Sequence, residues 1–267
     1  MPRKYFWNTA RTRCRLRSRA VAETAAAPGK VSEWCRERLD LTLDEWQVEF
    51  LDAPHKRRVL VGARQCGKST VAAALAVARM MSKPGCRVVV VASSRQQSRL
   101  LVEKVRAYAR RMGEPGKGDG VNPHSLRLNN GSTAVPLPCT ALTNRGFTAD
   151  VLFLDEAAGI PERVYVAVRP MLAATNGELV LSGTAADPTG FFYKAASDTR
   201  EGWLRQVVRA WDVKRYSKEF LEEEKRELGA DEFAREYGCQ FTDSGVGMFD
   251  RHLVESAITD RVKPLFG

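Results

Sequence analysis

The sequence lacks the features that would assign it to a membrane or a zinc-stabilised class. No hydrophobic run approaches the roughly 20 residues that a membrane span requires. The longest, Val71 to Met81, is Ala-rich and contains Arg79. The chain has only three histidines, and its six cysteines form no CxxC pair. A structural zinc site is therefore not expected, and the scattered thiols indicate reduced cysteines in a cytosolic protein.

Acidic residues are absent from residues 1–22, which hold seven Lys and Arg residues. This tail carries most of the net charge of +10 and leaves a nearly balanced body. Two interpretations are open on composition alone. The tail has the pattern of a mitochondrial transit peptide, and it also has the pattern of a solvated basic arm that contacts nucleic acid or a partner protein.

Strands and helices are predicted to alternate along the chain, which is typical of an α/β protein with a mainly parallel sheet flanked by helices. The predicted strands are 57–61, 87–92, 151–154, 178–181 and 204–210, with a hairpin around Asn130-Gly131. The predicted helices are 34–51 (broken near Asp40 and Thr42), 69–81, 93–112, 161–174, 217–228 and 231–237.

A phosphate-binding loop is the most specific motif in the sequence. Residues 62–69 read GARQCGKS and fit G-x-x-x-x-G-K-[ST] at a strand-to-helix junction. Its glycines let backbone N–H groups surround phosphates, Lys68 is expected to reach the β- and γ-phosphates, and Ser69 to ligate Mg²⁺. The predicted phosphate-binding residues are Gly62, Ala63, Arg64, Gln65, Cys66, Gly67, Lys68, Ser69 and Thr70.

Two adjacent carboxylates follow the predicted strand 151–154. Asp155 is expected at the carboxyl end of that strand, where it can bind Mg²⁺, and Glu156 can polarise an attacking water as a general base. The strand 87–92 lies between this motif and the phosphate loop. That order predicts a P-loop NTPase of the additional-strand, catalytic-glutamate group.

Taken together, these motifs resemble the large terminase subunit of tailed bacteriophages, the motor that packs DNA into a preformed capsid. Further residues carry the resemblance: Trp46-Gln47 before the loop, Arg64 within it, and Ser182-Gly183-Thr184 after the carboxylates. Ala185 departs from the family, which more often has Pro at that position. The resemblance covers about residues 41–249.

The resemblance implies roles for these residues. It implies that Trp46 and Gln47 bind adenine, that Ser182, Gly183 and Thr184 couple hydrolysis to DNA movement, and that Arg145 is offered to the ATP of a neighbouring subunit. Arg64 either satisfies local carbonyl groups or senses the γ-phosphate, and Trp46 has core packing as an alternative.

Four arginines, at 95, 99, 106 and 110, have a spacing that puts them on one helix face. Either they contact DNA phosphates or they form a solvated basic face.

The expected function is ATP hydrolysis with Mg²⁺ that drives double-stranded DNA into a viral procapsid. A helicase-like DNA-dependent ATPase and a nucleotide-gated binding or scaffold protein are the alternatives. The family implies a homo-oligomeric ring on the capsid portal, the small terminase subunit as a partner, and the bacterial host cytoplasm as location.

The predicted domains are a basic, disordered arm (1–30), the ATPase domain (31–245) and a linker (246–267) toward a nuclease domain absent from this chain. A bacterial location favours the arm over a transit peptide. No acidic cluster follows Phe249, so nuclease activity is not expected from this chain.

Overall fold

The computed structural model describes residues 29–114, 116–118, 120, 122–139, 147–199 and 201–242. Most of the predicted N-terminal arm, the whole predicted linker and Arg145 lie outside these residues. Within the described part, no helix is both long and apolar enough to cross a membrane.

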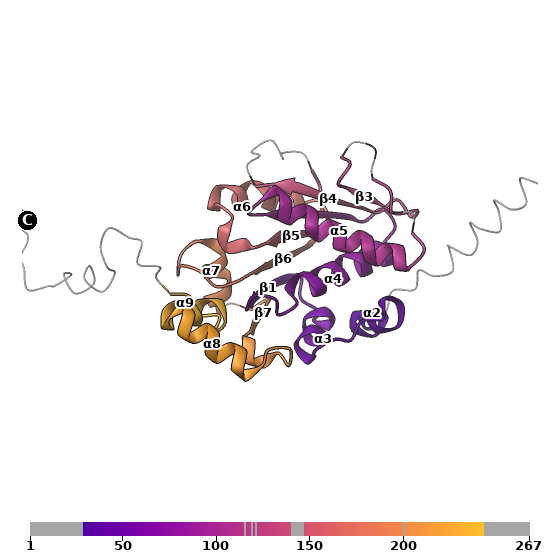
Figure 1. Cartoon of the computed structure of the whole chain (residues 1–267). Coiled ribbons are helices and arrows are strands. Elements are labelled where there is room, and N and C mark those ends of the chain that lie inside the picture. The colour runs from indigo at the N-terminus through magenta and orange to yellow at the C-terminus, as the bar shows by residue number, and fades with distance from the viewer. Residues whose placement is uncertain are drawn as a thin grey trace, which may run out of the picture.

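A seven-stranded sheet forms the centre of the fold, in the order β3-β4-β2-β5-β6-β1-β7 (Figure 1). All neighbouring strands run parallel except β3 and β4. The strands are β1 (Arg57–Gly62), β2 (Arg87–Ala92), β3 (Leu126–Arg127), β4 (Thr133–Pro138), β5 (Val151–Asp155), β6 (Glu178–Gly183) and β7 (Trp203–Val208). The expected α/β class with a mainly parallel sheet is therefore confirmed.

The α-helices flank this sheet. They are α2 (Val31–Leu39), α3 (Glu45–Asp52), α4 (Lys68–Ser82), α5 (Arg95–Arg111), α6 (Glu162–Val168), α7 (Gly190–Ser197), α8 (Lys218–Leu228) and α9 (Ala230–Glu236). Three short 3₁₀ turns are η1 (Ala157–Gly159), η2 (Arg169–Leu172) and η3 (Ala210–Asp212). Helices α4 and α5 pack together, with α5 also on β2 and β4, and α8 and α9 lie side by side at the lower left of Figure 1.

The Ala-rich composition of α4 explains its central position. All residues from Val71 to Ala78 are buried, and α4 contacts α2, α3, α5 and β2. Small side chains allow a helix to approach several neighbours closely, while the Val-rich β2 supplies the volume that fills the sheet side of the core. Burying each such Val side chain contributes about 1.5–3 kcal/mol.

The predicted break in 34–51 is confirmed: Asp40 has a left-handed backbone (φ 51°) that ends α2. The predicted cap at Thr42 is wrong, because Asp44 is the N-cap of α3. Helix α3 begins after Asp44 because the side chains of Asp44 and Gln47 form a reciprocal capping box. The helix predicted over 161–174 ends at Val168 and continues as the 3₁₀ turn η2.

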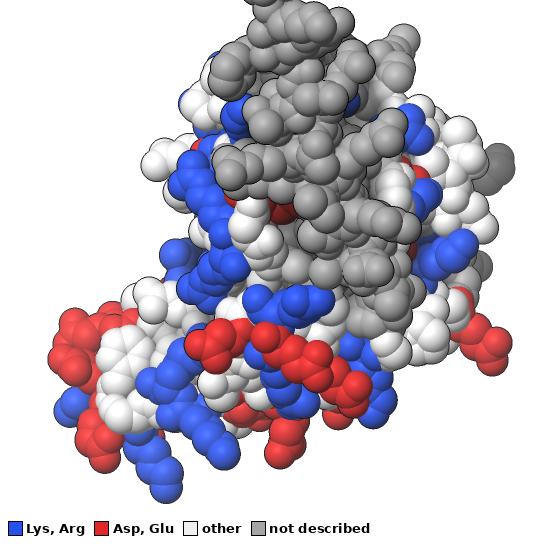
Figure 2. All heavy atoms as spheres, turned by 90° about the vertical axis from the view of Figure 1, so that its right-hand side faces the viewer, with Lys and Arg blue, Asp and Glu red and all other residues white. Residues whose placement is uncertain are grey.

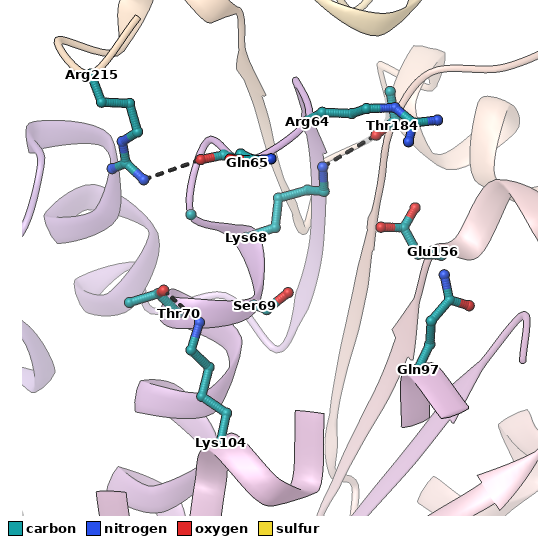
Figure 3. Close-up of a pocket in the computed structure, with 11 residues that line it drawn as sticks. Arg64, Gln65, Lys68, Ser69, Thr70, Gln97, Lys104, Glu156, Thr184 and Arg215 are labelled. Atoms are coloured by element: carbon teal, nitrogen blue, oxygen red, sulfur yellow. Dashed lines mark hydrogen bonds between the residues drawn. The ribbon is translucent and has the colours of Figure 1, made fainter. Parts of the chain in front are cut away.

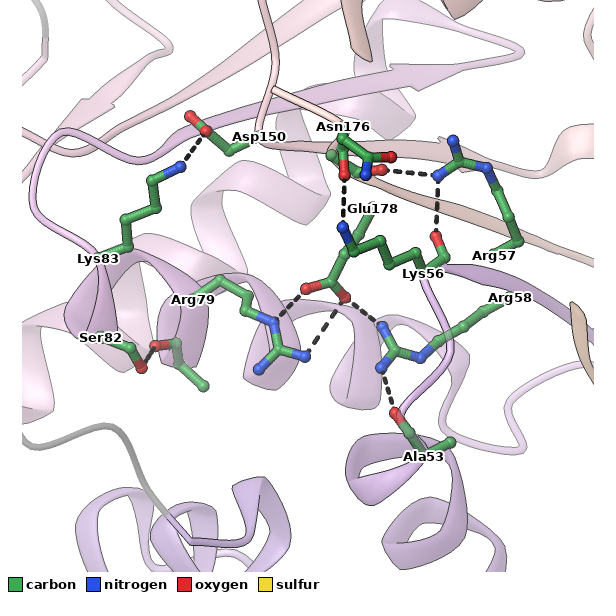
Figure 4. Close-up of polar contacts among 12 residues, drawn as sticks. Ala53, Lys56, Arg57, Arg58, Arg79, Ser82, Lys83, Asp150, Asn176 and Glu178 are labelled. Atoms are coloured by element: carbon green, nitrogen blue, oxygen red, sulfur yellow. Dashed lines mark hydrogen bonds and ion pairs between the residues drawn. The ribbon is translucent and has the colours of Figure 1, made fainter. Parts of the chain in front are cut away.

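A buried ion cluster joins β1, β6 and α4 at the amino-terminal ends of the strands (Figure 4). Arg58 is 1% exposed, donates to Glu178 and also donates to the carbonyl of Ala53 at 2.7 Å. Arg79 Nε donates to the other carboxylate oxygen of Glu178 at 2.5 Å. Burial lowers the pKa of Arg58, and Glu178 opposes this effect.

Replacing Glu178 with Ala is expected to destabilise the fold by about 3–5 kcal/mol, because it leaves the buried Arg58 guanidinium without its carboxylate. Urea unfolding measures the loss. The control is Glu33→Ala, which removes an exposed ion pair with Lys30 and should cost roughly 1 kcal/mol or less. Equal losses in the two variants would contradict the importance of the cluster.

Candidate functional site

The phosphate loop runs from the end of β1 to the first turn of α4, as predicted. Gly67 has φ 109°, a conformation that side chains rarely adopt. A Cβ atom at this position would lie 2.7 Å from Gln47 Nε2, so glycine is required there by both backbone and space. The loop therefore meets the amino-terminal end of a 15-residue helix, where unpaired N–H groups favour anions.

Lys68 lies in the curve of this loop. Its Nζ donates to the carbonyl oxygens of Gly62 (2.8 Å) and Ala63 (3.0 Å) and to Thr184 Oγ1 (3.2 Å). The last bond connects the phosphate loop to the residue that follows β6 (Figure 3). A charge-assisted contact thus links the predicted phosphate and coupling motifs.

Asp155 and Ser182 are register partners at the carboxyl ends of β5 and β6. The Ser182 hydroxyl donates to the Asp155 carboxylate at 2.8 Å. Burial raises the pKa of Asp155, and the Ser182 bond and Lys68 oppose the rise. A carboxylate in this position suits a hard divalent cation, which would relieve its desolvation.

Glu156 follows directly and has a left-handed backbone (φ 50°, ψ 49°). This conformation is uncommon for a residue with a side chain, and here the carboxylate faces the cavity (Figure 3). Burial raises the pKa of Glu156, with Lys68 acting in the opposite direction. A raised pKa brings a carboxylate closer to the range in which it accepts a proton efficiently.

A cavity of about 600 Å³ collects these groups. Its lining residues come from the loop, from α5, from the ends of β5 and β6, and from the segment before α8 (Figure 3). They are Arg64, Gln65, Gly67, Lys68, Ser69, Thr70, Gln97, Lys104, Glu156, Thr184 and Arg215. The volume and the convergence of polar groups fit a small-molecule site.

Arg64 lines the cavity, but its guanidinium is also engaged by Glu236 on α9. Nε donates to one carboxylate oxygen at 2.5 Å and Nη2 to the other at 3.1 Å. The hydrogen bond to Glu236 raises the pKa of Arg64. The backbone N–H of Arg64 also donates to the carbonyl of Glu236 at 3.4 Å. The loop arginine is therefore held by a helix that comes much later in the chain.

Trp46 and Gln47 lie against the phosphate loop at Gly67 rather than among the cavity-lining residues. The amide oxygen of Gln47 accepts from Asp44 N at 3.0 Å, so one edge of this amide is used as a helix cap. The indole N–H of Trp46 is buried without a hydrogen-bond partner in the described structure. Binding of adenine by this pair stays a prediction.

Three cavity residues were not anticipated from the sequence. Arg215 donates to the carbonyl of Gln65 at 3.1 Å and to Asp44 at 2.9 Å. Lys104 donates to Thr70 Oγ1 at 2.9 Å, and burial lowers its pKa. Gln97 also lines the cavity. It lies seven residues before Lys104, so helical spacing alone could have indicated that the two side chains share one face of α5.

The arginine face predicted on α5 is wrong at one of its four positions. Arg106 is only 8% exposed, and it pairs with Glu103 and donates to the carbonyl of Ser125 at 2.6 Å. Arg110 packs near Gly116 of the same loop. The loop that follows α5 covers Arg106, whereas Arg95 and Arg110 stay exposed.

The parallel sheet, the phosphate loop and the acidic pair at the end of β5 define a P-loop NTPase. A family model described as "Terminase large subunit, T4likevirus-type, N-terminal" matches residues 59–256. The chain belongs to this family. The expected resemblance and the fold class are thereby confirmed.

Known relatives agree with this assignment. The terminase large subunit of Thermus virus P23-45 is 25% identical over 73% of this chain and 47% of that protein. The large terminase ATPase domain of Thermus phage P74-26 has 24% identity and a TM-score of 0.69, over 80% of this chain and 100% of that one. The HK97 bacteriophage large terminase has 18% identity and a TM-score of 0.58, over 76% of this chain and 45% of that one.

A large terminase of a thermophilic bacteriophage, solved in complex with ATP-gamma-S, has 15% identity and a TM-score of 0.63, over 75% of this chain and 53% of that one. This chain spans about half the length of the curated relatives it matches.

Replacing Gly67 with Ala is expected to weaken ATP binding by at least about tenfold, or ~1.4 kcal/mol. The new methyl group would meet Gln47 and push the loop out of shape. Fluorescent nucleotide titration measures the effect. Gly85→Ala is the matched control, since Gly85 also has positive φ (71°) but open space around it. Similar ATP affinity in both variants would contradict the steric argument.

Proposed function

We propose that this chain hydrolyses ATP and uses the energy to move double-stranded DNA into a viral procapsid. The observation that carries the proposal is the contact network Lys68–Thr184 and Ser182–Asp155. It joins the residues suited to phosphate and metal binding to the two hydroxyl residues that the family resemblance assigns to coupling. Family membership favours this function over the helicase-like and scaffold alternatives.

The phosphate loop and α4 are assigned to the ATP phosphates. Backbone N–H groups of residues 62–70 would hold the oxygens, and Lys68 would exchange its loop carbonyl contacts for the β- and γ-phosphates. ATP-gamma-S in the large terminase of a thermophilic phage supports this choice of ligand.

Mg²⁺ fits the residues present. The Ser69 hydroxyl is exposed toward the cavity, and the buried Asp155 carboxylate lies at the adjoining strand end. Both offer oxygen ligands of the kind Mg²⁺ prefers, with substrate phosphates and water completing the shell. When bound, the ion neutralises charge on the phosphates.

Glu156 is assigned as the general base. Its carboxylate faces the cavity from a backbone conformation that separates it from Asp155. It would accept the proton of the attacking water, while Lys68 and Arg64 offset negative charge on the transferring group. Arg64 would have to leave Glu236 for this role. We assign Arg145, outside the described residues, to the ATP of a neighbouring subunit.

The contacts of residues 182–184 support a coupling role. Ser182 bonds the carboxylate assigned to the metal, and Thr184 bonds the lysine assigned to the γ-phosphate. Loss of that phosphate would change both partners at once. Gly183 lies close to Ala157, the residue after Glu156, where a Cβ would be 3.1 Å from its backbone N. The segment can thus transmit the nucleotide state to the end of β6.

We assign the partners by family: a homo-oligomeric ring on the capsid portal, the small terminase subunit and double-stranded DNA, in the bacterial host cytoplasm. The face in Figure 2 shows Lys and Arg along its left and right margins, with acidic side chains among further basic ones toward the bottom. Within the described residues drawn there, no single basic band marks a DNA track. We assign DNA contact to no particular side chain.

Replacing Glu156 with Gln is expected to lower kcat for ATP roughly 10²–10⁴-fold, because the amide cannot accept the proton of water. ATP affinity should change by no more than about twofold, since phosphate contacts remain. Steady-state turnover and nucleotide titration separate the two quantities. Glu219→Gln, an exposed change on α8, is the control. A variant at position 156 that turns over ATP like this control would contradict the assignment.

Double-stranded DNA is expected to raise the ATP turnover of the assembled protein, because a translocating motor couples hydrolysis to DNA contact. Turnover is measured with and without linear duplex, at several salt concentrations, since phosphate contacts weaken with salt. Single-stranded DNA of equal length is the control, and stronger stimulation by it would favour the helicase-like alternative. No turnover in any assembled state would refute the motor.

A further inference from the structure

Gln97 lies beside the carboxyl ends of the central strands. Strand β2 ends at Ala92, the register partner of Asp155, and α5 begins three residues later. Gln97 is the third residue of that helix. Two elements adjacent in sequence therefore bring its side chain to the cavity that contains Glu156.

The amide of Gln97 has a defined orientation. Its oxygen Oε1 accepts from Ser93 Oγ (2.5 Å), from the backbone N of Ser94 (3.2 Å) and from Ser94 Oγ (3.1 Å). A rotated amide would place its NH₂ group against the N–H of Ser94, two donors facing each other. The capping box thus directs the NH₂ group away from the cap, and in Figure 3 it points toward Glu156.

We propose that Gln97 is a positioning residue for ATP hydrolysis, whose amide N–H groups hold the Glu156 carboxylate toward the attacking water. The inference rests on the role of Glu156 proposed above. An amide suits this task because it donates a hydrogen bond while remaining neutral. A cation at the same point would stabilise the carboxylate more strongly and make it a weaker base.

Lys104, the cation on the same face of α5, is held elsewhere. Its ammonium group bonds Thr70 Oγ1, on the α4 side of the cavity. Helix α5 therefore presents a neutral donor near Glu156 and a charged one near the loop. One side of the cavity therefore has a neutral donor next to the proposed base, and the other side has a cation next to the phosphate loop.

A purely structural role as a helix cap is the competing explanation, and Gln97→Glu separates the two. Glutamate is also favoured at this capping-box position, so its carboxylate can accept from Ser94 as the amide does. The second oxygen would face Glu156 with an acceptor where Gln97 has a donor. We expect kcat to fall roughly tenfold or more, with ATP affinity within about threefold and an unchanged Tm.

Gln96→Glu is the matched control, because the neighbouring glutamine is exposed and receives the same charge change. A second pair of variants covers poor folding of Gln97→Glu. Gln97→Met keeps the length but removes the donor, whereas Ser94→Ala removes the other half of the cap and leaves the amide. We expect kcat to fall in Gln97→Met and to stay within about threefold of wild type in Ser94→Ala.

Equal kcat in Gln97→Glu and Gln96→Glu, or equal losses in Gln97→Met and Ser94→Ala, would overturn the proposal. Glu156→Gln is measured in parallel. If it retains turnover, the role of Glu156 itself fails. If it is inactive while both Gln97 variants match Gln96→Glu, only the role of Gln97 fails.

Discussion

The parallel register of four strands is the constraint on which the site depends. Ala92 pairs with Asp155, Asp155 with Ser182, and Gly183 with Val61 just before the phosphate loop. Because the strands end level, residues from four distant segments meet along one edge without any long loop. A shift of one residue in any pair would turn the corresponding side chain to the other face of the sheet. The buried, apolar residues within the strands fix that register, and the register in turn fixes the positions of the site residues.

Local sequence was sufficient for the motifs that sit on these strand ends. The phosphate loop and Asp155-Glu156 each depend on a strand, a turn and nearby residues, and all were identifiable in the sequence. Gln97 and Arg215 were not, because their places depend on how α5 and the segment before α8 pack around the loop. The prediction that Arg106 shares an exposed face of α5 was wrong for a related reason. Periodicity predicts which residues share a helix face, but not whether a later loop will cover it.

The phosphate loop is held in place by residues of α3 and of the segment before α8. Gln47 packs against Gly67 while its oxygen caps α3, and Asp44 of the same cap accepts from Arg215. Arg215 in turn reaches the carbonyl of Gln65. The loop thus lies between α3 on one side and the C-terminal segment on the other. The shape of the loop therefore depends on how both neighbours pack against it.

Charged side chains have different partners at the two ends of the strands. At the amino-terminal edge, opposite charges are in direct contact: Glu178 with Arg58 and Arg79, and Asp150 with Lys83 at 2.6 Å. The buried Arg58–Glu178 pair resists rearrangement, because separating its members leaves an uncompensated buried charge. At the carboxyl edge, Lys68, Lys104 and Glu156 face a shared cavity, and both lysines bond to neutral oxygens. Contacts to neutral oxygens are weaker than ion pairs, so they can be exchanged for phosphate when a nucleotide enters. The two lysines of the cavity are therefore free of carboxylate partners within the described residues and can exchange their contacts, whereas Arg64 must first leave Glu236.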